Sequence, residues 1–147
     1  MTKKISILFI LMCGVFTMVK AQYHCTVISA TRSNVTLRCT GYGKNAKAAL
    51  SSAERGAIET LLYVGAPRTP YSLPFINNKA EVEANNKQFF DTFYESSYKN
   101  FIESSVTVTA FGKDAEKRKC LTMDVNVRAE QLRSFLENNG IIRKFGF

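Results

Sequence analysis

The sequence predicts an α+β fold, in which a small antiparallel sheet has helices packed on one face. Two segments, 23–40 and 104–127, alternate apolar and polar residues as the arms of hairpins do. Two longer segments between them, 45–63 and 80–102, repeat apolar residues at helical spacing. Strands grouped apart from helices favour an antiparallel sheet over a parallel one. The predicted order is β-hairpin, helix, helix, β-hairpin, helix.

Residues 1–21 have the pattern of a cleavable signal peptide. Lys3 and Lys4 precede an apolar run that ends at Val19, and Val19 and Ala21 suit the positions before a cleavage site. The run is interrupted by polar residues and is shorter than the ~20 residues of a spanning helix. We therefore expect an exported chain, located in the periplasm, at the outer membrane or outside the cell. Its mature part would be a single domain, 22–147, without a membrane span.

Loss of this segment lowers the formal net charge from +8 to +5, because it holds three basic residues and no acidic one. The remaining charges are dispersed along the chain, which is typical of a solvated surface. We therefore expect no nucleic-acid partner.

One register of the first hairpin places all the apolar residues of its second arm on one face. Val35, Leu37 and Cys39 alternate with polar residues in its second arm, and a turn centred on Arg32 sets Cys25 opposite Cys39. The same register pairs Val27 with Leu37 and Ser29 with Val35. Because an exported chain meets an oxidising compartment, we predict a Cys25–Cys39 disulfide.

Cys120 is the cysteine left over in the mature chain. It faces away from the apolar side of its predicted strand, so we expect it to stay free or to pair between molecules.

The segment from Gly41 to Ala46 reads G-x-G-x-x-A between a strand and a helix, which is the setting of a dinucleotide-binding turn. Such a fold needs a second parallel strand soon after the helix. A loop with Pro67, Pro70 and Pro74 follows instead. We therefore interpret the glycines as a bend that lets an alanine-rich helix, 45–63 with Asn45 as its N-cap, approach the sheet closely.

The second half of the chain continues with a helix, two strands and a helix. The helix at 80–102 carries a broad aromatic face, and the strands at 104–111 and 119–127 form the second hairpin. A short helix at 128–139 ends at Gly140. Aromatic residues at this spacing are usually core, and a groove that binds carbohydrate is the alternative.

Catalytic and metal-binding patterns are weak. His24 is the single histidine, so an ordinary zinc site cannot be assembled, and no G-x-S-x-G motif is present. A paired-carboxylate hydrolase stays open, since several acids surround the aromatic segment: Glu81, Glu83, Asp91, Glu95 and Glu103. Acids on a helix usually form a solvated face. We expect no cofactor, no metal and no enzymatic activity.

The last seven residues, 141–147, form an apolar and basic tail. Its side chains are too apolar for a free end and too basic to be buried together: Ile141, Ile142, Arg143, Lys144, Phe145 and Phe147. Two arrangements reconcile this. The tail lies along its own sheet as an edge strand, or it binds a partner by strand addition.

Three segments together resemble a known family: the alanine-rich helix "NAKAALSSAERGAIETLL" after Gly-x-Gly, then "SYKNFIESSVTV", then "CLTMDVNVRAEQLRSFLENNGI". Their pattern, from about Val35 to Asn139, is similar to the small α/β module of the N-terminal domain of flagellar assembly protein T and of related exported lipoproteins. The resemblance implies an assembly or docking component of envelope machinery and supplies no catalytic residues.

Our leading hypothesis is a non-enzymatic, exported bacterial envelope protein that acts by protein–protein contact, with envelope proteins as partners. The rival is a secreted hydrolase or a protein that binds a small ligand or carbohydrate through the aromatic helix, 89–102. A pocket lined by Phe93, Tyr94 or Tyr98 with two convergent carboxylates would favour the rival. A filled core at those positions would favour the contact protein.

Overall fold

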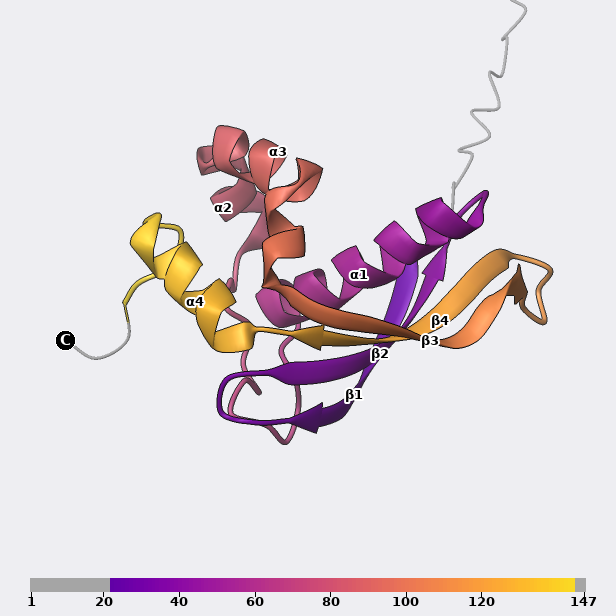
Figure 1. The fold of residues 1–147 in the computed structure, drawn as a ribbon. Helices are drawn as coiled ribbons and strands as arrows, with labels where there is room; N and C mark the ends of the chain where they lie inside the picture. The colour runs from indigo at the N-terminus through magenta and orange to yellow at the C-terminus, as the bar shows by residue number, and fades with distance from the viewer. Residues whose placement is uncertain (1–21, 145–147) are drawn as a thin grey trace, which may run out of the picture.

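The computed structural model describes residues 22–144 as a four-stranded antiparallel sheet with one long helix across a face (Figure 1). The α+β class predicted from the sequence is confirmed. The strands lie in the order β1-β2-β4-β3. In chain order the elements are β1 (Tyr23–Ala30), β2 (Val35–Tyr42), α1 (Ala46–Tyr63), α2 (Lys79–Asn85), α3 (Lys87–Glu95), the 3-10 helix η1 (Ser97–Phe101), β3 (Ile102–Lys113), β4 (Lys119–Val127) and α4 (Ala129–Asn138). The segment predicted as a signal peptide, 1–21, lies outside the described residues.

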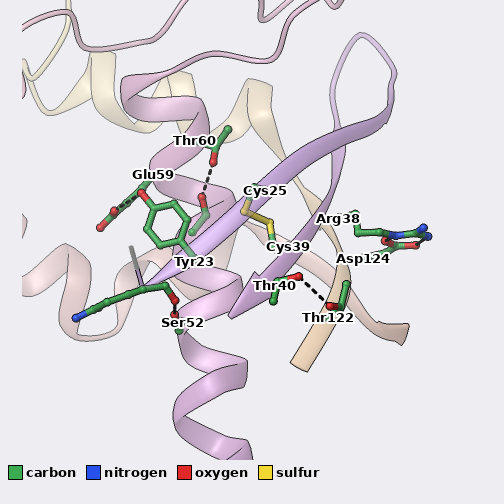
Figure 2. Close-up of a disulfide and its surroundings, with 12 residues drawn as sticks. Tyr23, Cys25, Arg38, Cys39, Thr40, Ser52, Glu59, Thr60, Thr122 and Asp124 are labelled. Atoms are coloured by element: carbon green, nitrogen blue, oxygen red, sulfur yellow. Dashed lines mark hydrogen bonds and ion pairs between the residues drawn. A yellow bond between two sulfur atoms is a disulfide. The ribbon is translucent and has the colours of Figure 1, made fainter. Parts of the chain in front are cut away.

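The first hairpin keeps the predicted register from Cys25 to Val27, which lie opposite Cys39 and Leu37. A shift between Val27 and Ser29 then sets Ser29 opposite Thr36, so the predicted pairing of Ser29 with Val35 is wrong. The cause is a bulge, which inserts one residue that strict alternation does not reveal. Cys25 and Cys39 are joined by a disulfide, with their Cα atoms 4.1 Å apart (Figure 2).

The core lies between α1 and the sheet. Val35, Leu37 and Cys39 on β2 are fully buried, and each lies opposite a buried residue of β4. The other face of the sheet is polar: Arg38 donates to Asp124 at 2.8 Å (Figure 2). This face carries no helix, so one side of the sheet forms the core and the other stays open.

Gly41 and Gly43 permit α1 to lie directly on β2. A Cβ atom on Gly41 would lie 2.1 Å from the backbone oxygen of Ala49, and one on Gly43 would lie 2.5 Å from the Ala49 nitrogen. Neither glycine is among those with positive φ. Close packing, rather than an unusual backbone conformation, therefore requires both.

The long aromatic helix predicted at 80–102 is broken into three pieces. It stops at Asn86 and again at Ser96, whose backbone angles are not helical, and Ile102 already belongs to β3. The side-chain amide of Asn86 donates to the Val82 carbonyl oxygen. Asn and Ser compete for backbone hydrogen bonds and so favour helix ends. Helix α1 lies across the face of the sheet, while α2, α3 and α4 gather at one end (Figure 1).

Substitution of Gly41 tests the close approach. We expect Gly41→Ala to lower the free energy of unfolding by about 1–3 kcal/mol, because a methyl group would push α1 off the sheet. Gly112→Ala is the matched control, since the nearest atom to its Cβ would be 3.8 Å away. Urea denaturation followed by circular dichroism measures both variants. Equal stability of Gly41→Ala and the parent chain would contradict the packing account.

Removal of the disulfide tests the hairpin. The bond closes a loop with a sequence separation of 14. We expect the double substitution Cys25→Ala and Cys39→Ala to cost about 2–4 kcal/mol, because the unfolded chain regains the entropy of that loop. Cys120→Ser controls for loss of a thiol and should leave the melting temperature close to that of the parent. A double variant as stable as the parent would show that the bond adds nothing.

Candidate functional site

The loop between α1 and α2, residues 64–78, is fixed at both ends. The backbone nitrogen of Ile76 donates to the Leu62 carbonyl oxygen at 2.8 Å, and that of Ala66 donates to the Tyr71 carbonyl oxygen at 2.7 Å. The Tyr71 hydroxyl donates to the backbone oxygen of Arg32 in the first hairpin. Burial raises the pKa of this phenol. The proline loop is therefore an ordered wall that is anchored to the hairpin turn.

The start of the C-terminal tail lies next to this loop. Gly140 ends α4 in a left-handed conformation, with φ at +69°, as the sequence predicts for a helix C-cap. The backbone nitrogen of Ile141 donates to the Leu136 carbonyl oxygen, and the Ile141 side chain is 9% exposed, so it belongs to the core. Residues 141–144 form no strand, so the edge strand, one of the two arrangements that the sequence left open, does not form in the described part of the tail. The left-handed turn directs Ile141 into the core instead.

The remaining tail residues divide into two groups. Ile142 packs against the core as a partly buried side chain, while Arg143 and Lys144 are exposed. Phe145 and Phe147, which the sequence assigns to the same contact segment, lie outside the described residues.

The proline loop and the tail together form an open groove of about 680 Å³. One wall is the loop and the other is α4 with the tail, at the end of the molecule where α4 lies (Figure 1). Its lining combines apolar side chains, basic side chains and two asparagines: Leu73, Phe75, Val82, Ile141 and Ile142; Arg133 and Arg143; Asn77 and Asn78. Among the described residues, the lining includes no carboxylate. The groove lining therefore combines apolar side chains with two arginines.

Leu73 is the most exposed large apolar side chain of the described chain, at 76%. Phe75 beside it is partly buried, and the guanidinium of Arg133 lies 5.6 Å from its ring. Arg133 also forms an ion pair with Glu137. Exposed aliphatic and aromatic groups beside arginine are typical of surfaces that bind proteins. The sequence analysis missed Leu73 and Phe75. The signal that could have found them is that this loop contains large apolar residues, although its prolines are typical of an exposed loop.

The aromatic segment forms a core. Phe93 is 1% exposed and Tyr98 is 4% exposed, and the ring of Phe93 stacks on that of Phe135 from α4. Tyr94 is partly exposed and lines a shallow hollow of about 400 Å³ with Glu83 and Asp91. Asp91 is already paired with Lys87. Phe93 and Tyr98 thus occupy filled core positions, whereas Tyr94 lines a hollow that also contains two carboxylates.

Two tyrosines share the Glu83 carboxylate. The Tyr63 hydroxyl donates to it at 2.6 Å, and the Tyr94 hydroxyl lies 2.6 Å from that of Tyr63. Burial and the hydrogen bond to Glu83 raise the pKa of Tyr63 well above the ordinary value of a phenol. These bonds join α1, α2 and α3, because each residue comes from a different helix. A carboxylate held by two phenols is a structural acceptor.

A second hydrogen-bonded carboxylate, that of Glu59, joins α1 to β1. The Tyr23 hydroxyl and the Arg55 guanidinium both donate to the buried carboxylate of Glu59, each at 2.7 Å (Figure 2 shows Tyr23 and Glu59). Arg55 also lies over the Tyr94 ring, 4.1 Å from its centre. Both acids therefore have hydrogen-bond donors within the fold.

The remaining sequence candidates do not assemble a site. His24 is exposed on edge strand β1. Within residues 22–144, no group of three or more potential metal ligands comes together. Cys120 lies opposite Tyr42 on the open face of the sheet and carries a free thiol. Over the same described range, no helix is both long and apolar enough to cross a membrane.

Comparisons with protein-family models, with curated proteins and with solved structures gave no match to this chain.

The pKa of Tyr63 leads to a prediction about alkaline stability. A folded-state pKa above the unfolded value, 10.0, means that the unfolded chain releases this proton first as pH rises. The stabilisation that the protonated Tyr63 phenol contributes is complete below about pH 10 and is lost as the pH rises above that value. We expect Tyr63→Phe to cost about 1–2 kcal/mol near neutral pH, because Glu83 loses a donor. Between about pH 8 and pH 11, the free energy of unfolding of this variant should then fall by less than that of the parent chain.

Urea denaturation at the two pH values provides the measurement. Tyr42→Phe is the comparison, because burial raises the pKa of Tyr42 less than that of Tyr63, so this variant should lose alkaline stability more nearly as the parent does. A Tyr63→Phe variant that loses stability at alkaline pH as steeply as the parent would contradict the assignment to Tyr63.

Proposed function

We propose that this chain is a non-enzymatic, exported protein of the bacterial envelope that acts by protein–protein contact. The contact site is the groove between the proline loop and the tail, and the carrying observation is its composition. Exposed Leu73 and partly buried Ile142 lie beside Arg133 and Arg143, without a carboxylate in the lining. A partner segment with one or two apolar side chains and a flanking acid fits this groove.

The fixed walls of the groove support a docking role. Both walls are held by backbone hydrogen bonds, at Ile76 in the loop and at Ile141 in the tail. A partner would therefore bind a surface that is largely preformed, so little ordering entropy opposes the contact. Arg143 of the tail lines the groove, and it and Lys144 are exposed.

The remaining parts of the proposal come from the sequence. The pattern at 1–21 supports export to the periplasm, the outer membrane or the cell exterior. The resemblance to the flagellar assembly protein T module supports an accessory role in an envelope assembly. The polar clusters around Glu59 and Glu83 are internally satisfied, which supports a function without catalysis.

Affinity capture from crosslinked cell envelopes tests the proposal. The parent chain should recover a defined partner, while Leu73→Asp and Arg143→Glu should each lower that recovery at least about tenfold, as at an interface hot spot. Val64→Asp is the matched control, because Val64 is a loop residue that is 66% exposed and lies outside the groove. Each variant should melt as the parent does. Recovery of the parent chain alone, or equal loss with Val64→Asp, would overturn the proposal.

A further inference from the structure

The groove between the proline loop and the tail leaves apolar surface in water. Leu73 is 76% exposed, and Phe75 and Ile142 in the same lining are only partly buried. The three side chains border one open space of about 680 Å³. Contiguous exposed apolar surface of this kind marks a binding site. The groove therefore has room and an apolar surface for a segment that carries large apolar side chains.

The chain supplies such a segment directly beside the groove. Residues 145–147, which lie outside the described part of the chain, read Phe-Gly-Phe. They are separated from Arg143, which lines the groove, by a single residue. An extended chain advances at most about 3.3–3.6 Å per residue, so the Cα atom of Phe145 lies within about 7 Å of that of Arg143 and the Cα atom of Phe147 within about 14 Å. Both rings are therefore within reach of the lining.

The alternation of the tail sets which of its side chains face the groove. Arg143 is part of the lining, whereas Lys144 is exposed and is not. In an extended chain successive side chains point to opposite sides. Phe145 and Phe147 then share the side of Arg143, and Gly146 shares that of Lys144. An extended continuation of the tail thus directs both aromatic rings to the lining and a glycine away from it.

We propose that residues 145–147 bind the groove of their own chain, where their two rings cover Leu73 and Phe75. This contact removes apolar surface of both the tail and the lining from water, which is its main favourable contribution. The tail is tethered at the groove, so the contact forms within one chain, at an effective concentration that a separate molecule rarely reaches. It uses side chains instead of the strand pairing that either arrangement from the sequence requires.

The charged groups of the lining also suit aromatic rings. Arg133 and Arg143 contribute guanidinium groups, and the lining contains no carboxylate among the described residues. A guanidinium is attracted to the face of an aromatic ring. Arg133 already lies 5.6 Å from the ring centre of Phe75, so the groove holds one ring in the way that we propose for the tail.

The contact would regulate the groove, and this part of the inference rests on the proposed function. A tail that covers Leu73 competes with a partner segment for the same surface. A partner then binds only those chains whose groove is open, and its apparent Kd rises by the reciprocal of that open fraction. The tail is thus an internal competitor that a partner must displace.

Nuclear Overhauser spectroscopy of the full mature chain tests the contact without any partner. The ring protons of Phe145 and Phe147 should give cross-peaks to the Leu73 methyl groups. Loss of each cross-peak in Phe145→Ser or Phe147→Ser separates it from those of Phe75. The absence of any such cross-peak would overturn the proposal. A mixture of labelled and unlabelled chains excludes a second copy, because cross-peaks that arise only between different chains would also overturn it.

The double variant Phe145→Ser and Phe147→Ser tests the regulation by affinity capture from crosslinked envelopes. Its partner recovery should exceed that of the parent at least about threefold, as expected if the groove is open in about a third of parent chains. Phe111→Ser is the matched control, because Phe111 is exposed on β3 and lies outside the lining. A partner recovered equally by parent and double variant would overturn the regulation. Cross-peaks to Leu73 without a captured partner would uphold the tail contact and count against the proposed function alone.

Discussion

The close approach of α1 to β2 is the constraint on which the rest of the structure depends. Ala49 and Ala53 lie against Gly41, with no side chain between helix backbone and strand. A helix that lies this close covers the centre of the sheet by itself. The larger aromatic side chains of α3 have no room beneath it and pack with α4 at the end of the sheet instead. The groove lies at that same end, because α4, the tail and the proline loop meet there.

The polar interior strengthens this arrangement. Glu59 and Glu83 are acids on or beside α1, and each accepts hydrogen bonds from tyrosine. A buried carboxylate without donors would be costly, so such acids need fixed partners. Here the partners come from β1, α1 and α3, and the same bonds tie those elements to the helix. Of the acids that left a hydrolase open in the sequence, Glu83 is thus part of this framework.

Much of the fold could be predicted because local patterns dominate it. The bounds of β4 match the prediction, since Leu121, Met123, Val125 and Val127 alternate strictly under α1. The break of the aromatic helix could not be predicted from periodicity, because apolar spacing continues across Asn86 and Ser96. The groove was missed for a different reason: its walls are 60 residues apart in the chain, and only tertiary packing brings Leu73 near Ile142.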